Sequence, residues 1–93
     1  MKTKISLRAF ADLEAIYDYT RDQLGRIQAE IYRENIDDVF KLISQQPEMG
    51  RLVSTDLKLR QFPLGKHIIL YRVTADAIYI MRIKSGSDIR PQG

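Results

Sequence analysis

The chain has 93 residues, of which 44% are hydrophobic and 29% are charged, and these values predict one globular domain spanning residues 1–93. It contains no cysteine, which excludes disulfides and thiolate metal sites, and a single histidine is too few for the usual structural zinc sites. We therefore expect neither a metal nor a cofactor. The sequence shows no secretory signal and no apolar run of about 18 residues, so we expect a cytoplasmic protein without a membrane span.

The net charge of +3 is unevenly distributed along the chain. Residues 1–49 carry seven Lys and Arg against nine Asp and Glu, whereas residues 50–93 carry eight against three. A basic C-terminal half favours an acidic partner, which is a nucleic acid, an enzyme that acts on nucleic acid, or an acidic protein. A solvated sheet face without a partner also fits these charges, and that alternative stays open.

The first half of the chain predicts a strand followed by two helices. Lys2–Leu7 alternates between polar and apolar residues like a short strand, and Ser6 is placed to cap the helix that follows. Apolar residues then recur at three- and four-residue steps up to Gly25, which is suited to end the helix in a left-handed conformation. A second amphipathic helix is predicted over about Ile27–Gln45, where Pro47 prevents its continuation.

The second half predicts a loop and three strands. In chain order the predicted segments are a loop at Arg51–Asp56, a strand at Leu57–Phe62, a turn at Pro63-Leu64-Gly65, a strand at Lys66–Val73, a turn at Thr74-Ala75-Asp76 and a strand at Ala77–Ile83. The apolar run Ile68–Tyr71 indicates a central strand covered on both faces. The polar segment Lys84–Gly93 is predicted to be a loosely ordered tail. The order β-α-α-β-β-β predicts an α+β fold of two layers, an antiparallel sheet packed against an antiparallel helical hairpin.

Three stretches of this sequence carry a family resemblance. They are ADLEAIYDYT in the first helix, PEMGR after the second helix, and RQFPLGKHIILYRV with IYIMRI in the sheet. In this order and spacing they resemble the ParE-type toxins of the RelE/ParE superfamily of bacterial toxin–antitoxin modules. The resemblance covers the chain from Ile5 to about Asp88 and implies the same two-layer fold.

The superfamily has two branches, for which the resemblance implies different targets. RelE-like members cleave mRNA in the ribosomal A site, and ParE-like members poison DNA gyrase. Cleavage of mRNA needs a general base, a general acid and cationic phosphate ligands, which RelE-like enzymes take from sheet Lys and Arg and from a Tyr or His near the C-terminus. This chain has no tyrosine after Tyr79 and no histidine after His67, and Pro63 and Leu64 lie where RNA-cleaving relatives tend to place a basic residue. We therefore favour a gyrase poison without catalytic residues of its own.

Two other interpretations stay open. One is a RelE-like mRNA interferase in which Lys66 and His67 form a substitute catalytic pair, although His67 is also explained as a strand-end residue bonded to a turn. The other is a non-toxic module that only binds an antitoxin. The tail motif of ParE toxins, a histidine followed by Gly-Arg-Arg-Asp, is only partly present, because residues 83–88 read IKSGSD.

The resemblance implies a cognate ParD-like antitoxin whose disordered segment folds on the toxin. We expect that segment in a groove lined by apolar residues of the helices, and we expect Lys4–Leu7 and Leu57–Phe62 to be edge strands open to an added strand. The candidates for contact with the target or the antitoxin are the basic residues Arg60, Lys66, Arg72, Arg82 and Lys84. Direct contact with nucleic acid is a secondary possibility.

Two of these arginines pose a specific question. Arg72 and Arg82 lie on strands joined by a tight turn, and like charges directly opposite each other would destabilise the ladder unless a partner carboxylate or phosphate relieved them. The alternative is that each arginine pairs within the chain, with Asp56, Asp76 or a helix glutamate.

Overall fold

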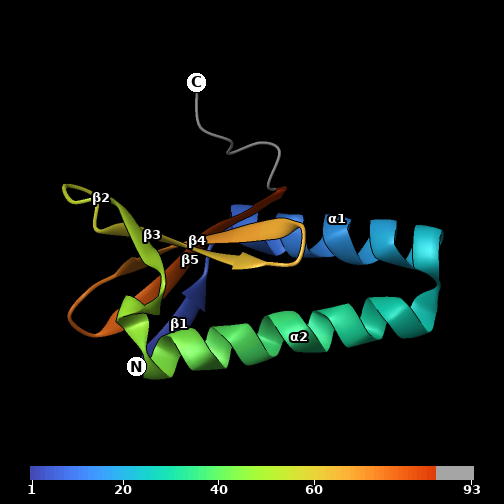
Figure 1. The fold of residues 1–93 in the computed structure, drawn as a ribbon, viewed down its shortest axis with the longest axis horizontal. Coiled ribbons are helices and arrows are strands. Elements are labelled where there is room, and N and C mark those ends of the chain that lie inside the picture. The colour runs from blue at the N-terminus through green and yellow to red at the C-terminus, as the bar shows by residue number, and fades with distance from the viewer. Residues whose placement is uncertain (86–93) are drawn as a thin grey trace.

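A helical hairpin packs against a five-stranded sheet in the computed structural model, which describes residues 1–85 (Figure 1). The elements in chain order are β1 (Lys2–Ile5), α1 (Leu7–Leu24), α2 (Arg26–Gln45), the short 3-10 helix η1 (Pro47–Met49), β2 (Arg51–Ser54), β3 (Leu59–Leu64), β4 (His67–Val73) and β5 (Ala77–Ser85). The predicted α+β architecture is confirmed. Within residues 1–85 no helix is both long enough and apolar enough to cross a membrane.

The sheet is mixed rather than wholly antiparallel, which corrects the prediction. Its strand order is β1-β5-β4-β3-β2, and β1 runs parallel to β5 while the other neighbours are antiparallel. The helical hairpin carries the chain from β1 to the opposite edge of the sheet, and the three following strands return step by step until β5 fills the place beside β1. A parallel pairing of the first and last strands follows from this return.

The edge formed by β2 was not predicted. Residues 51–54, expected to lie in a loop, form this strand, and it pairs with β3 across a register shift between Leu52 and Ser54. A four-residue strand with a bulge shows no clear alternation in the sequence. The expectation that Leu57–Phe62 is an edge strand is therefore wrong, since β3 pairs on both sides, whereas the edge position of β1 is confirmed.

The turn between β3 and β4 is shorter than predicted. Pro63 and Leu64 belong to β3, and only Gly65 and Lys66 connect the strands, with Gly65 at φ +59°. Pro63 is tolerated in the strand because β2 pairs with β3 only as far as Gln61, so that no other strand of the described part of the chain needs its missing N–H. The predicted tail also begins too early, since residues 84 and 85 extend β5. The rest of that tail, residues 86–93, lies outside the described residues.

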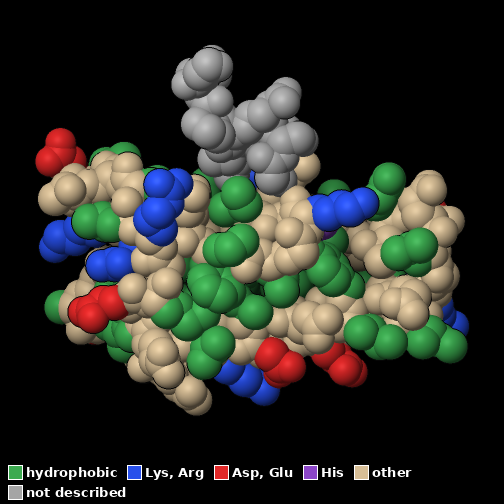
Figure 2. All heavy atoms as spheres, viewed as in Figure 1, with side chains coloured by type: hydrophobic (Ala, Val, Ile, Leu, Met, Phe, Trp, Pro, Cys, Tyr) green, Lys and Arg blue, Asp and Glu red, His purple; other side chains and the backbone are tan. Residues whose placement is uncertain are grey.

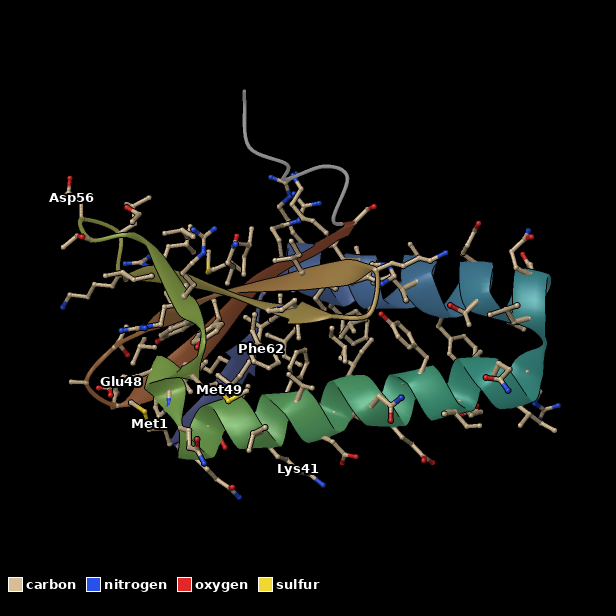
Figure 3. The ribbon with its side chains drawn as sticks, in the orientation of Figure 1. Met1, Lys41, Glu48, Met49, Asp56 and Phe62 are labelled. Carbon is tan, nitrogen blue, oxygen red and sulfur yellow. The ribbon has the colours of Figure 1, made fainter. Side chains whose placement is uncertain are left out.

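The core lies between the helices and one face of the sheet. Its buried members are Ala9, Ile36, Phe40, Ile43, Ile69, Tyr71, Ile78, Ile80 and Ile83. Phe62 and Met49 pack against this cluster, and Figure 3 shows both side chains in the space between the sheet and α2. On the opposite face of β4, Ile68 and Leu70 are only half-buried. The prediction that the run Ile68–Tyr71 forms a strand covered on both faces is therefore wrong. No helix within residues 1–85 covers the face of β4 that carries Ile68 and Leu70.

Both predicted helix ends are confirmed. Ser6 Oγ accepts a hydrogen bond from the Ala9 N–H at 3.0 Å and donates one to the Met81 carbonyl at 2.8 Å, so this residue caps α1 and ties it to β5. Gly25 ends α1 at φ +92°, a conformation that disfavours a side chain, and α2 begins at the next residue.

The segment after α2 is held by a buried hydroxyl. Tyr71 on β4 donates to the Pro47 carbonyl at 2.8 Å and accepts from the Gly50 N–H at 2.9 Å. A Cβ on Gly50 would lie 2.5 Å from that hydroxyl oxygen, so only glycine fits there. The short PEMGR stretch is therefore a structural junction between α2 and the sheet.

Candidate functional site

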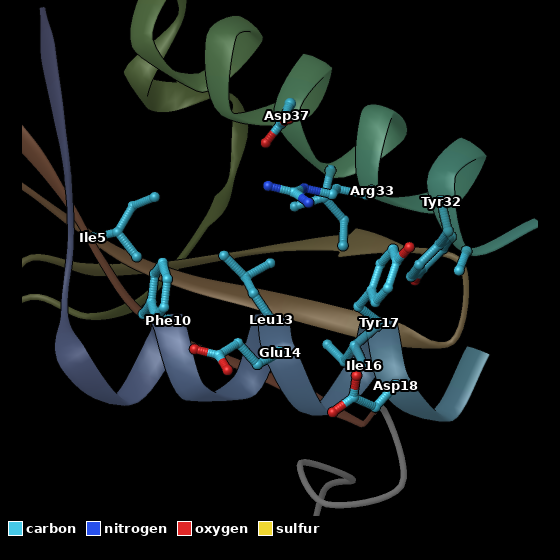
Figure 4. A pocket seen from close by; sticks show the side chains of 12 residues that line it. Ile5, Phe10, Leu13, Glu14, Ile16, Tyr17, Asp18, Tyr32, Arg33 and Asp37 are labelled. Atoms are coloured by element: carbon cyan, nitrogen blue, oxygen red, sulfur yellow. The ribbon is translucent and has the colours of Figure 1, made fainter. Parts of the chain in front are cut away.

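A groove of about 430 Å³ runs between α1 and α2. Phe10, Leu13 and Tyr17 point into it from α1, Arg33 and Asp37 line it from α2, and Ile5 of β1 closes one end (Figure 4). Phe10 is 55% exposed although it belongs to the apolar stripe of α1. The helices diverge from the tight turn at residue 25 (Figure 1). Apolar side chains of both helices, among them Phe10 and Ile31, stay exposed. The expected groove lined by helical apolar residues is thus present.

The charges around this groove are mostly acidic. Glu14, Asp18 and Asp37 lie on its lining, against the single cation of Arg33. Near the turn the Tyr17 hydroxyl donates to Glu30 at 2.8 Å, a hydrogen bond that raises the pKa of Tyr17. On the face seen in Figure 2, hydrophobic side chains gather in the band between the sheet and α2, and acidic side chains border it along α2. The groove therefore suits an apolar segment that carries a basic residue.

The sheet has the opposite charge character. None of the five strands contains Asp or Glu, whereas they contain seven Lys and Arg in total. The register places most of these on the face turned away from the helices. Lys4 aligns with Tyr79, which aligns with Arg72, and Lys84 aligns with Ile68. Arg51 lies on the same face, because it aligns with Gln61 of β3 and Gln61 aligns with Leu70 of β4.

We name the residues of this surface the basic face: Lys2, Lys4, Arg51, Arg72 and Lys84. Two of them, Arg72 and Lys84, were predicted contact residues. The other three residues of the basic face were not among the predicted contact residues. Lys2 and Lys4 were detectable, because they alternate with Thr3 and Ile5 along β1, but Arg51 was assigned to a loop.

The basic face is partly ordered by its own contacts. Arg72 donates through Nε to the Leu57 carbonyl at 2.9 Å, which leaves its terminal guanidinium nitrogens without a partner among residues 1–85. The Lys4 ammonium lies 5.5 Å from the centre of the Tyr79 ring, over its face. These contacts orient the side chains without neutralising them.

Arg60 lies on the other side of the sheet. Its Nη1 donates to the Gly50 carbonyl at 2.7 Å and to the Glu48 carbonyl at 3.3 Å. This guanidinium therefore fastens the segment after α2 to β3, next to the junction held by Tyr71. Figure 3 shows Glu48 and Met1 at this end of the molecule.

Arg82 is paired within the chain. It aligns with Leu70 rather than with Arg72, whose neighbour on β5 is Tyr79, so the two arginines are not opposite each other. Arg82 forms an ion pair with Asp12 of α1, with Nε 2.8 Å from Oδ2. Of the two alternatives, cross-strand repulsion is therefore excluded, and pairing within the chain holds for Arg82, with the helix residue Asp12 in place of the expected partners.

Lys66 and His67 occupy different surroundings. Lys66 is exposed in the turn, whereas the His67 ring is half-buried with Nδ1 2.6 Å from the Tyr32 hydroxyl oxygen. The same hydroxyl lies 3.0 Å from the Leu64 carbonyl oxygen, so Tyr32 links the imidazole to the end of β3. Burial lowers the pKa of His67 and raises that of Tyr32. His67 thus joins α2 to the start of β4. Residues 1–85 hold no group of three His, Cys, Asp or Glu that could bind a metal.

Comparisons with known proteins agree with this architecture. Residues 3–90 match the family described as the ParE toxin of the type II toxin–antitoxin system, parDE. The chain is 32% identical over 72 residues to Toxin ParE1 of Caulobacter vibrioides, covering 75% of this chain and 74% of that protein. It is also 32% identical over 81 residues to Toxin ParE1 of Mycobacterium tuberculosis, covering 85% and 83%.

Solved structures show the same fold. A chain of the chromosomal ParDE toxin–antitoxin system from P. aeruginosa superposes with a TM-score of 0.79 at 27% identity, covering 91% of this chain and 95% of that chain. A YoeB/ParE toxin from Agrobacterium tumefaciens superposes with a TM-score of 0.64 at 17% identity over 91% and 98%, a likeness of fold alone. The match over nearly the whole length shows that the chain belongs to the ParE toxin family of type II toxin–antitoxin systems.

Proposed function

We propose that this toxin poisons DNA gyrase in the cytoplasm, without catalysis of its own, and is neutralised by a cognate antitoxin. The observation that carries the proposal is the family match over residues 3–90, together with relatives named Toxin ParE1. The solved neighbour from the P. aeruginosa ParDE system supports an antitoxin partner. A toxin that acts by binding needs an ordered contact surface and no acid–base pair. The basic face offers such a surface, because it is charged and its side chains are partly held by contacts within the chain.

The surroundings of His67 favour a non-enzymatic role. General acid–base cleavage of RNA needs a group that changes protonation while it contacts the substrate. The Nδ1 atom of the only histidine of the chain is engaged by Tyr32, and burial lowers the pKa of this ring. Lys66 is exposed beside it in the turn and contacts no group that would orient it for catalysis among residues 1–85. These two residues therefore support an mRNA interferase poorly.

The antitoxin is proposed to occupy the groove between α1 and α2. An amphipathic helix of the antitoxin would place apolar side chains against Phe10, Leu13 and Tyr17 and a basic one near Asp37. Binding that orders a disordered segment also covers the apolar surface that the toxin leaves exposed.

The five predicted contact residues divide into two roles in this proposal. Arg72, Lys84 and Lys66 face outward and are proposed to contact the target. Arg60 and Arg82 bond to the chain itself and are proposed to act indirectly, by holding η1 and α1 in place.

The test is a plasmid cleavage assay with purified gyrase. Supercoiled plasmid, gyrase and toxin are incubated with ATP and treated with detergent and protease, and linear DNA is expected to accumulate only when gyrase is present. Addition of the cognate antitoxin should abolish it. Cleaved mRNA in a ribosomal translation assay, with intact plasmid in the gyrase assay, would identify an interferase instead. Inactivity in both assays with retained antitoxin binding would leave only the non-toxic module.

A further inference from the structure

We propose that the basic face binds the sugar–phosphate backbone of duplex DNA directly, in the absence of gyrase. The activity goes beyond the proposed function, in which the target is a protein. The proposal rests on three observations. They are the opposite charges of the two layers, the spacing of the cations on the basic face, and the scarcity of aromatic side chains on that face.

The two layers of the molecule carry opposite net charges. Eight Asp and Glu side chains lie on α1 and α2, against five Lys and Arg. The strands contain seven Lys and Arg and no acidic residue, and the nearest acidic side chains along the chain, Asp56 and Asp76, lie in turns. Arg60 lies on the helix side of the sheet and Asp12 balances the charge of Arg82, so the five cations of the basic face make up the remainder. An uncompensated positive surface of this kind attracts a polyanion.

The spacing of the cations on the basic face fits a ligand whose negative charges lie along two separated lines, as the two phosphate backbones of duplex DNA do. Neighbouring strands lie about 4.8 Å apart and every second residue of a strand is about 6.7 Å further along, so Arg72 lies about 10 Å from Lys4, about 12 Å from Arg51 and about 14 Å from Lys84. These separations are close to the width of about 12 Å across the major groove of B-DNA. A single carboxylate would reach only one of these cations at once.

The same face is poorly suited to single-stranded nucleic acid. Sequence-tolerant binding of single strands relies on aromatic side chains that stack with bases. Tyr79 is the one aromatic residue on this face within residues 1–85, and the Lys4 ammonium already lies over its ring. The other apolar residues that the register places on this face include Ile68, Leu70, Leu59 and Pro63, none of which is aromatic. Backbone charge is therefore the feature available for recognition, as in non-specific duplex binding.

The test is fluorescence anisotropy with purified toxin and a fluorescein-labelled 20-base-pair duplex, without gyrase. Four or so phosphate contacts predict a slope of log affinity against log salt of about −3.6, which is a loss of about a hundredfold between 50 and 200 mM salt. The double variant Arg72→Gln/Lys84→Gln should bind at least tenfold more weakly at 50 mM salt and reduce the slope by about 2.

A matched control separates the basic face from net charge. Arg26→Gln/Lys41→Gln removes the same number of charges from exposed positions of α2 and should bind DNA as the wild type does. Circular dichroism shows that each variant is folded. The proposal is overturned if the duplex does not bind at 50 mM salt, if the control variant loses as much affinity as the basic-face variant, or if a labelled oligoglutamate peptide binds the face more tightly than the duplex. Plasmid cleavage by gyrase is measured separately on the same variants, so loss of DNA binding with retained cleavage leaves the proposed function standing.

Discussion

Asp12 on α1 accepts hydrogen bonds from both the side chain of Arg82 and the backbone N–H of Ile83 on β5, at 2.8 and 2.9 Å from the same Oδ2 atom. The pairing of β1 with β5 stops at Ile5, where the chain turns into α1. Beyond that point no strand within residues 1–85 pairs with β5 on this side, and a buried N–H without an acceptor is costly. The Asp12 carboxylate accepts the hydrogen bond from Ile83 that a neighbouring strand would otherwise accept, and Arg82 balances the charge of this carboxylate.

The first prediction concerns this contact. Burial works to raise the pKa of Asp12, but the hydrogen bonds from Arg82 and Ile83 and the positive charges of Arg82 and Arg8 outweigh it, so the pKa falls below 3.8. Asp12→Asn should reduce the free energy of unfolding by about 1.5–3 kcal/mol at pH 7, the range for hydrogen bonds to a charged group. Urea denaturation measures this, and the exposed Asp38→Asn on α2 is the control, which should change stability by less than about 0.5 kcal/mol.

The same carboxylate predicts a pH dependence. Because the folded pKa is lower than the unfolded one, the stabilisation is present above the unfolded pKa and is lost as the pH falls through the folded pKa. Wild-type stability should therefore decline as the pH drops below about 3.8, and the part of the decline due to Asp12 should be missing in Asp12→Asn. Equal pH profiles for the two proteins would show that Asp12 is not the titrating group.

The second prediction concerns the buried hydroxyl of Tyr71. Tyr71→Phe leaves the Pro47 carbonyl and the Gly50 N–H unpaired in the interior, which should cost about 1–3 kcal/mol of unfolding free energy. Tyr79→Phe is the matched control, because its hydroxyl makes no hydrogen bond within residues 1–85, and its stability should stay close to the wild type. Chemical denaturation gives the free energy of unfolding of both variants. Equal values for the two would contradict the role of the Tyr71 hydroxyl.

The third prediction concerns His67. Burial lowers its pKa below 6.5, so the unfolded chain binds its proton first as the pH falls. The contribution of the neutral imidazole to the free energy of unfolding is fully present above about pH 6.5. It should be lost progressively as the pH falls through the lower folded pKa. An NMR titration of the imidazole C–H signals gives the folded pKa directly, and a value at or above 6.5 would refute the burial argument. His67→Gln should remove this part of the pH dependence.

The fourth prediction concerns antitoxin binding in the groove. Phe10→Asp places a charge on the apolar floor of the groove beside Glu14, and should weaken binding of the cognate antitoxin at least tenfold. Leu7→Asp, on the same helix at 90% exposure and outside the groove lining, should bind the antitoxin as the wild type does. Isothermal titration calorimetry compares the two variants. If both bind normally, the antitoxin occupies another surface.

Much of the fold was predictable because it depends on short-range pattern. The apolar periodicity of α1 and α2, the cap at Ser6 and the left-handed Gly25 are properties of neighbouring residues, and the structure confirms them. The hairpin between β4 and β5 belongs to the same class, since a three-residue turn joins two strongly apolar strands.

The errors came from contacts between distant segments. The parallel partnership of β1 with β5 and the edge position of β2 depend on where the helical hairpin returns the chain, which local periodicity does not encode. The partner of Arg82 lies 70 residues away, and it was missed because the end of β1, not the sequence around Arg82, creates the need for Asp12.

The sequence by itself determined the two-layer fold, the family resemblance and the excess of positive charge in the second half, because periodicity and composition are local quantities. Only the tertiary structure decided which basic residues act together. Strand register gathers Lys4, Arg51, Arg72 and Lys84 from four strands onto one face, while Arg60 bonds to carbonyls on the other side and an ion pair with Asp12 balances the charge of Arg82. Register is set by the packing of side chains on a shared core, and so the surface opposite that core becomes visible only when the whole sheet is assembled.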